Sequence, residues 1–597
     1  MFDASMVTRA MQLEPATQQE LEDAASLRPG DYEIYSENVN LMLQEGKEVM
    51  TKMGISSMLH SGDTLVAVYT AHGDLVSAVL GTYLHSVTGQ VPIKFIRERF
   101  ADDPSVGVSE GDIYYCNEAL YGGIHNPDQF AIMPVFGGPE LLGWVVSGAH
   151  QSETGGSEPG GEVTQAHTRH DEGMKLTPIK IGASYRLRND LLLMMENFIS
   201  RAPRMQVTDV KARVAACDRV RIRLQALAAK RGNALVRGLF RRMIQQTSAG
   251  VRQRIESWPD GIYRHNVFMD TTGHEDGLLR ASVAVTVSGD RLTLDFSGTS
   301  PEHEGSYNAF TNVIRGHCAV NLYQFPFHDF PISSGMLEHI DIRVPHGTFF
   351  DADPEAAISC SPLVGAMVFP LLHLYQKQQR DTCGFGKYRG GLGAAVGYVV
   401  YHTPHLAFTS SQKESKFPAH NGLFGGYSMT VVPGIRVRGS DLLELMAAGE
   451  PSLPTDDFML ASGETALGGE VIVEHQTRGI RVVQEGDVLA ASTQGSGGYG
   501  DVLERDPEAV VEDVRADRIS DWTAREVYAV AYDPESLIVD EGATGELRRA
   551  QRARRLANGR PYAEFIADWE QRRPPEQVLK YFGEWPSGTP NRAVVRI

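Results

Sequence analysis

Residues 117–161 read NEALYGGIHNPDQFAIMPVFGGPELLGWVVSGAHQSETGGSEPGG, and this segment carries a clear hairpin pattern. Two apolar runs of strand length, residues 130–136 and 141–147, flank a turn that contains Gly-Gly-Pro. Runs of this kind separated by a glycine-containing turn predict a β-hairpin. The outer ends of a hairpin lie side by side, so residues before the first run are expected to lie beside residues after the second.

Three candidate metal ligands, His125, Asp128 and His150, stand at those two outer ends. Pro127 disfavours a helix at Asn126, so the first two candidates are expected on a tight loop. Two imidazoles and one carboxylate form a common set of ligands for a catalytic divalent metal with open coordination positions. The segment therefore predicts a metal site. Because short His-x-x-Asp motifs are common, surface or hydrogen-bonded histidines are the alternative.

Other polar residues near these candidates have less specific interpretations. Glu118, Glu153 and Glu158 could be further ligands or could orient an imidazole, but solvation is the default expectation for a glutamate. His167 and His170, in the loop that follows, are also expected to be exposed to solvent.

The composition excludes several classes of function. The chain has 597 residues, of which 42% are hydrophobic and 22% charged, as in ordinary globular proteins. Its length predicts about three or four domains. A formal charge of −19 argues against nucleic acid and anionic membrane surfaces as partners. Neither a signal peptide nor a membrane span is recognised, and five cysteines without a CxxC pair predict buried, reduced thiols in a cytoplasmic protein.

The periodicity of apolar residues predicts an α+β, multi-domain protein with mixed sheets. We expect an N-terminal α+β region with the metal-binding hairpin over residues 1–188 and a helical segment over 189–260. A sheet-rich central region with glycine-rich turns follows over 261–500, and a helical C-terminal region over 501–597.

Individual elements are predicted from the same periodicity and from turn residues. Expected helices lie within residues 17–25, 35–53, 189–258 with breaks at Pro203 and Gly232, 308–325, 356–379, 507–514, 524–529 and 546–556. Besides the hairpin, expected strands lie at residues 64–70, 280–287, 291–296, 471–475 and 481–483, with 77–85 as helix or strand. Residues 151–188 are expected to form a long functional loop. Arg213, Arg219 and Arg221 are expected on a solvated helix face, with a subunit interface as the alternative.

Short motifs for nucleotide binding and for a catalytic nucleophile are either absent or stand in the wrong structural context. Residues 495–500 fit GxGxxG, but the next helical pattern begins only at Pro507, so a tight glycine turn is favoured over a dinucleotide site. The sequence contains no GxxxxGK[ST], so the chain has no P-loop, and no GxSxG nucleophile motif is present.

Four blocks in the same order resemble the hydantoinase B/5-oxoprolinase family, and most closely its metal-carrying large subunits of acetone carboxylase and related ketone carboxylases. The blocks are residues 62–85, residues 295–309 with DFSGTS and YNA, residues 387–391 (KYRGG), and residues 494–501 (QGSGGYGD). The sequence NEALYGGIHNPDQ at residues 117–129 favours the carboxylases within that family.

This resemblance implies a metal-binding subunit of a hetero-oligomeric, ATP-dependent ketone carboxylase that converts a ketone and bicarbonate to a β-keto acid. His125, Asp128 and His150 match the family's metal ligands. Manganese is the favoured metal, with zinc or iron as alternatives. ATP and magnesium would bind a hydantoinase A-like ATPase partner, and a small third subunit is left open.

Two other functions stay open at this stage. The resemblance also admits an ATP-dependent cyclic amide hydrolase acting on N-methylhydantoin, 5-oxoproline or a lactam. The third hypothesis is that this chain is a non-enzymatic scaffold that stabilises the ATPase subunit.

Overall fold

The computed structural model describes residues 4–79, 83–324, 326–368, 381–393, 395–400, 404–409, 418, 420–431, 434–450, 467–474, 480–492, 495–576, 579–580 and 584–586. Contacts group the described residues into two compact units. Unit 1 contains those of Met1–His265 and Ser282–Phe369, and unit 2 those of Asn266–Ala281 and Pro370–Asn591. The four regions expected from the sequence stay a prediction. None of the described helices has both the length and the apolar composition needed to cross a membrane.

A seven-stranded sheet lies at the centre of unit 1, with strand order β2-β1-β5-β4-β3-β6-β7. Its strands are β1 Thr64–Thr70, β2 Leu75–Val79, β3 Ile113–Cys116, β4 Asp128–Gly137, β5 Glu140–His150, β6 Ile179–Ala183 and β7 Arg186–Leu187. The predicted hairpin is confirmed as β4 and β5, which pair antiparallel along their whole length. The predicted strand at residues 64–70 is confirmed as β1, which pairs with β5.

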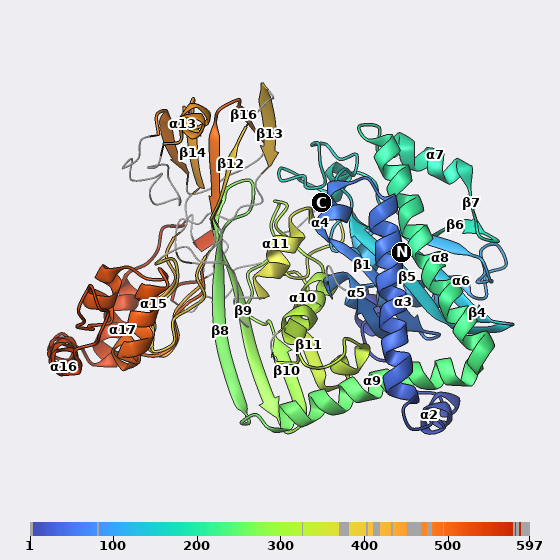
Figure 1. Ribbon diagram of the computed structural model, residues 1–597, viewed down its shortest axis with the longest axis horizontal. Coiled ribbons are helices and arrows are strands. Elements are labelled where there is room, and N and C mark those ends of the chain that lie inside the picture. The colour runs from blue at the N-terminus through green and yellow to red at the C-terminus, as the bar shows by residue number, and fades with distance from the viewer. Residues whose placement is uncertain are drawn as a thin grey trace. The chain divides into compact units, whose positions relative to one another are not determined.

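Long helices cover one face of this sheet (Figure 1). They are α3 Asp31–Met53, α7 Asn189–Phe198, α8 Pro203–Arg231 and α9 Asn233–Glu256. Alternate strand residues such as Ala131, Val145 and Ala149 form a buried apolar core with these helices. The predicted breaks are confirmed: α8 begins at Pro203, and Gly232 separates α8 from α9 at a φ of 89°, which favours glycine.

Several further helices also belong to unit 1. They are α1 Ala4–Ala10, α2 Gln18–Ala25, α4 Ser57–Ser61, α5 Tyr83–Thr88, α6 Gln90–Phe100, the 3₁₀ turn η1 Ala119–Tyr121 and α10 Thr311–Gln324. Thr17 starts α2 as expected, because its side chain and that of Glu20 form a reciprocal capping box. α5 contacts both α10 and β1. These contacts place α5 where its histidine can reach the end of β1.

A second sheet has the order β11-β10-β9-β8. Its strands are β8 Gly261–Thr271, β9 Asp276–Ser288, β10 Arg291–Asp295 and β11 Ile340–Arg343, followed by α11 Ser361–Ala366. The predicted hairpin of residues 280–296 is confirmed by the antiparallel pairing of β9 and β10. α10 confirms the helix expected at 308–325. α11 occupies only part of the helix expected at 356–379, and residues 369–379 of that prediction lie outside the described residues.

Unit 2 contains two smaller sheets and a helical C-terminal part (Figure 1). The strands are β12 Ala395–Val399, β13 His405–Thr409, β14 Gly434–Arg438, β15 Glu470–Glu474, β16 Ile480–Gln484 and β17 Val488–Ser492. The helices are α13 Leu442–Ala448, α15 Pro507–Arg515, α16 Glu541–Ala557 and α17 Tyr562–Gln571, with shorter turns η4 Val502–Glu504 and η5 Thr523–Val527. The helix expected at 524–529 is a short π-helical turn. β15 and β16 confirm two predicted strands, although His475 lies outside the described residues.

Glycine-rich segments of unit 2 stack closely against one another. A Cβ atom added at Gly390 would lie 2.0 Å from the carbonyl oxygen of Ser496, and one at Gly498 would lie 2.1 Å from that of Phe385. Backbone hydrogen bonds join the same segments, such as Leu423 N–H to Gly498 O at 2.9 Å. The GxGxxG segment is therefore a packing element, because its glycines let three backbones approach closely.

Two expectations about the middle of the chain need correction. Residues 151–188 are not one continuous loop, because β6 and β7 form at their C-terminal end and extend the sheet. The expectation that Arg213, Arg219 and Arg221 lie on a solvated helix face is also wrong in part. Arg213 and Arg221 are buried, whereas Arg219 is partly exposed and pairs with Glu45.

Candidate metal centre

The three predicted ligands converge at the open end of the β4–β5 hairpin, with one ligand atom from each lying within 4.8 Å of the others. His125 Nε2 is 3.1 Å from His150 Nδ1. The Asp128 carboxylate oxygens lie 3.5 Å from His150 Nδ1 and 3.7 Å from His125 Nε2. Asp128 and His150 are direct partners in the strand register, so the hairpin itself brings them together.

Hydrogen bonds fix the orientation of this cluster. His125 Nδ1 lies 2.8 Å from the carbonyl oxygen of Ser359. A carbonyl can only accept, so Nδ1 carries the proton and the Nε2 lone pair faces Asp128 and His150. The Asp128 carboxylate accepts from the backbone N–H groups of Ile124 and His125 at 3.3 and 3.4 Å. Backbone groups therefore orient both side chains: Ser359 orients His125, and the loop before β4 orients Asp128.

Burial and charge act in opposite directions on the three groups. All three side chains are buried or nearly so. Burial raises the pKa of Asp128, but the imidazoles of His85, His125 and His150 outweigh it and hold that pKa well below its usual range. Burial lowers the pKa of His125. For His150, burial also opposes the charge, yet the hydrogen bond to Asp128 raises its pKa overall. The cluster therefore holds the ionised carboxylate of Asp128 beside the neutral imidazole of His125, which can act as a metal ligand.

His85 and Asp63 adjoin the cluster and were not singled out by spacing. His85 Nε2 is 3.5 Å from Asp128 Oδ1 and 3.7 Å from Asp63 Oδ1. The imidazole is buried, and its Nδ1 has no hydrogen-bond partner among the described residues. Asp63 precedes β1 and about a third of its side chain is exposed. The only sequence signal for them was that both fall in the first block of the family resemblance.

The structure places the other nearby candidates as supporting residues. Glu118 and Glu153 are buried, so the expectation of solvation is wrong for both. Glu118 pairs with Arg169, and Glu153 pairs with Arg201 at 2.9 Å. Glu158 is partly exposed and accepts from the backbone of residue 164. His167 and His170 are exposed and Cys116 is buried, as expected.

The donor set fits a divalent cation. Two nitrogen ligands bound at about 2.1 Å to one cation lie roughly 3 to 3.4 Å apart, close to the observed separation of 3.1 Å between His125 and His150. A backbone carbonyl that orients the second ring nitrogen of a ligating histidine is a common outer partner in metal sites. Gly161 also approaches closely, because an added Cβ would lie 3.0 Å from His150 Nε2.

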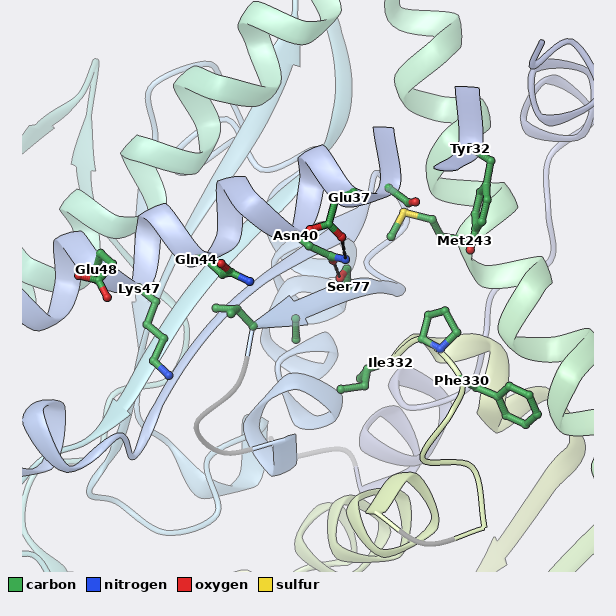
Figure 2. Close-up of a pocket in the computed structure, with 14 residues that line it drawn as sticks. Tyr32, Glu37, Asn40, Gln44, Lys47, Glu48, Ser77, Met243, Phe330 and Ile332 are labelled. Atoms are coloured by element: carbon green, nitrogen blue, oxygen red, sulfur yellow. Dashed lines mark hydrogen bonds between the residues drawn. The ribbon is translucent and has the colours of Figure 1, made fainter. Parts of the chain in front are cut away.

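A groove of about 700 Å³ lies elsewhere in unit 1, between α3, the edge strand β2 and the loop at residues 330–332. Figure 2 shows that Asn40 of α3 and Ser77 of β2 lie together in its lining, where a hydrogen bond of 2.9 Å joins their side chains. Tyr32, Met243 and Phe330 line one end. The lining of this groove includes none of the three candidate ligands.

Comparison with known proteins now assigns the chain to a family. The family model described as Hydantoinase B/oxoprolinase matches residues 28–368 and 364–502. This chain belongs to the hydantoinase B/oxoprolinase family. A relative from Aromatoleum aromaticum, named acetophenone carboxylase delta subunit, is 34% identical over 672 aligned positions that cover 98% of each chain. The resemblance inferred from the four sequence blocks is confirmed.

Two solved structures share the fold of this hydantoinase B/oxoprolinase chain. The nucleotide-free structure of acetone carboxylase has a TM-score of 0.80 at 21% identity and covers 92% of this chain and 86% of its own. The ATP-dependent caprolactamase from Pseudomonas jessenii has a TM-score of 0.69 at 19% identity, covering 88% and 100%. The predicted class, a multi-domain fold of helices and mixed sheets, is confirmed.

Proposed function

We propose that this chain is the metal-binding subunit of an ATP-dependent ketone carboxylase, which joins bicarbonate-derived carbon to an activated ketone to give a β-keto acid. The observation that carries the proposal is the convergence of His125, Asp128 and His150 at one point. The likeness to an acetophenone carboxylase subunit along nearly the whole chain supports the ketone as substrate class.

The arrangement of side chains suits this chemistry. A divalent cation, manganese in this proposal and zinc or iron as alternatives, would act as a Lewis acid on an enolate oxygen. Three protein ligands leave coordination positions open for small molecules. His125 and Asp128 are held by backbone groups, so their positions are set before substrate arrives. Their burial keeps water away from a reactive intermediate.

The proposal requires partner subunits. The sequence has no P-loop, so ATP and magnesium are assigned to a hydantoinase A-like ATPase subunit. The relative from Aromatoleum aromaticum and a caprolactamase relative from Pseudomonas jessenii are both named as subunits, which supports assembly with other chains. A small third subunit is part of the same hypothesis and would be identified by copurification.

A second candidate function is ATP-dependent hydrolysis of a cyclic amide. The fold shared with the caprolactamase favours it, and the same three side chains could hold a cation that activates water. The two functions share the site and differ in the nucleophile and the bond formed. They are separated by product, because one gives a β-keto acid and the other a ring-opened amino acid.

The test uses the chain copurified with its partner subunits. With ATP and isotopically labelled bicarbonate, acetone and acetophenone are compared with N-methylhydantoin, 5-oxoproline and caprolactam. Label in a β-keto acid that depends on ATP supports the proposal. Ring-opened product without incorporated label would instead establish the hydrolase.

A pair of histidine variants tests the metal site directly. His125→Ala is expected to lose bound divalent metal and ketone-dependent ATP turnover together. His167→Ala, an exposed histidine in the following loop, is the matched control and should retain both. Unchanged metal content and turnover in His125→Ala would favour the scaffold reading over any catalytic function.

A further inference from the structure

Three polar side chains of α8 line the buried face of that helix beneath the candidate centre. Gln206, Asp209 and Arg213 are spaced three and four residues apart, so they share one face of the helix. All three are fully buried. No ion pair within 4.0 Å joins Arg213 to a carboxylate among the described residues. Polar groups in this position require another explanation than apolar packing.

The first of these residues anchors the strand that carries Asp128. Gln206 Nε2 donates to the side-chain oxygen of Gln129 at 2.8 Å. The hydroxyl of Tyr115, on neighbouring β3, donates to the same oxygen at 2.7 Å. Gln129 follows Asp128 directly in β4, and successive strand residues face opposite sides of a sheet. The candidate ligand and its anchor are therefore adjacent residues on opposite faces.

The other two residues anchor the strand that carries His150. Arg213 Nη2 donates to Gln151 Oε1 at 2.8 Å and to the carbonyl oxygen of Ala149 at 3.1 Å. Gln151 Nε2 in turn lies 3.4 Å from Asp209 Oδ2 and donates to it. The backbone N–H of Gln151 also donates to Pro127 O at 2.8 Å. This last bond joins the two ends of the hairpin at the candidate centre.

The energetics argue against a purely stabilising role for this network. Arg213 Nε, Gln129 Nε2 and Gln206 Oε1 have no hydrogen-bond partner among the described residues. A buried polar cluster that leaves atoms unpaired gains less than its desolvation costs, and apolar side chains of the same volume would serve stability as well or better. Apart from the bond that Ile55 N–H donates to Asp209 at 2.8 Å, the side-chain contacts of the network with the hairpin fall on Gln129, Ala149 and Gln151, next to the candidate ligands.

We propose that Gln206, Asp209 and Arg213 form a positioning network that fixes the two strand ends bearing Asp128 and His150. The network touches neither candidate ligand side chain. It acts through Gln129 and Gln151, whose backbones are continuous with the ligands. The consequence for metal affinity rests on the proposed function, whereas the fixing of the strand ends is a property of the metal-free fold.

The test compares full-length variants by hydrogen exchange and metal titration. Gln129→Met and Gln151→Met remove the anchors with little change in volume. In the metal-free protein, each is expected to speed amide exchange in peptides spanning residues 125–129 and 149–151 about fivefold or more. Affinity for added Mn²⁺ is expected to fall about tenfold, as for other outer partners of metal ligands.

Ser147→Ala is the matched control, because it removes another hydrogen bond between the same strand and the same helix. Ser147 Oγ donates to the carbonyl oxygen of Arg213 at 2.6 Å, three residues before His150. This variant should leave exchange at the strand ends and Mn²⁺ affinity close to those of the wild type. If the network only stabilised the fold, the anchor variants and this control would have similar effects on amide exchange and Mn²⁺ affinity.

The outcomes distinguish the inference from the proposed function. Faster exchange confined to the strand ends supports the positioning role. Unchanged exchange there, or equal acceleration throughout unit 1, would overturn it. If the wild type binds no divalent cation, the proposed function fails while the exchange comparison still decides the positioning role. If the wild type binds Mn²⁺ and the variants bind it equally well, the inferred effect on affinity fails and the proposed function stands.

Discussion

His85 shows how a residue without a local motif can belong to the candidate centre. Its imidazole is buried, and its Nε2 lies 3.5 Å from Asp128 Oδ1, the oxygen that His150 also approaches. Burial alone would lower its pKa, but Asp128 and Asp63 raise the pKa overall. An imidazole in this position can donate to the carboxylate and limit its rotation, as outer partners of metal ligands do.

We therefore expect His85→Leu to weaken Mn²⁺ binding about tenfold without abolishing it. The replacement keeps a buried apolar volume and removes the donor to Asp128. Isothermal titration of the full chain measures the affinity. His60→Leu, at an exposed histidine in the preceding helix α4, serves as the control. Equal affinities of the wild type and His85→Leu would show that Asp128 needs no such partner.

Glu172, which is not one of the candidate ligands, allows a prediction about pH. Burial raises the pKa of its carboxyl from 4.5 to about 7, although Ile358 N–H donates to it at 2.6 Å. A folded-state pKa above the unfolded value means that the folded protein holds the proton more tightly. The contribution to stability is full below about pH 4.5 and is lost as the pH rises through about 7.

Glu172→Gln should therefore remove the loss of stability that the wild type shows as the pH rises. At pH 8 the variant is expected to be more stable than the wild type by roughly 3 kcal/mol, and the difference should shrink below pH 5. Urea unfolding at several pH values measures it. Stability curves that stay parallel from pH 5 to pH 8 would refute the buried, proton-binding state of Glu172.

At the scale of elements, sequence patterns succeeded where the signal was local. The turn between two apolar runs predicted β4 and β5, and the register of that hairpin then placed Asp128 opposite His150. Pro203 and Gly232 marked the ends of helices because their backbone preferences act on neighbouring residues.

The same patterns failed where distant segments decide the environment. His85 reaches Asp128 because α5 packs against β1, which pairs with β5. Arg213 was expected in solvent, since a charged residue on a long helix usually is, yet α8 turns that face onto the sheet. The glycine-rich segment at 495–500 was recognised as a turn. That it packs between two other backbones depends on contacts with segments far away in the sequence.

The glycine stacking of unit 2 gives a prediction about stability. In Gly390→Ala the new Cβ would lie 2.0 Å from Ser496 O, so the backbones must separate and their hydrogen bonds weaken. A loss of about 3 kcal/mol or more is expected, as for other overpacked sites. Gly545→Ala, in α16 with open space around its Cβ, is the control and should be stabilising by up to about 1 kcal/mol. Thermal unfolding of the two variants measures both effects, and equal small changes would argue against close packing of the glycine segments.

At the scale of the whole molecule, the division into two compact units predicts that metal acts on only one of them. All three candidate ligands, together with Ser359 and the α8 network, belong to unit 1. A ligand that binds the folded state alone stabilises it by about 2.7 kcal/mol at a concentration one hundred times its dissociation constant. Units that fold separately show separate transitions.

Differential scanning calorimetry of the full chain, with Mn²⁺ and after removal of metal by chelation, should therefore show one transition that moves. The transition assigned to unit 1 is expected to rise by several degrees with Mn²⁺, because about 2.7 kcal/mol is large relative to the stability of a domain. The transition assigned to unit 2 is expected to stay, and Gly390→Ala identifies it by lowering it selectively. In Asp128→Asn, which lacks the charged ligand, Mn²⁺ should leave both transitions in place. A metal-dependent shift of the unit 2 transition, or an unaltered shift in Asp128→Asn, would place the bound cation outside the β4–β5 hairpin.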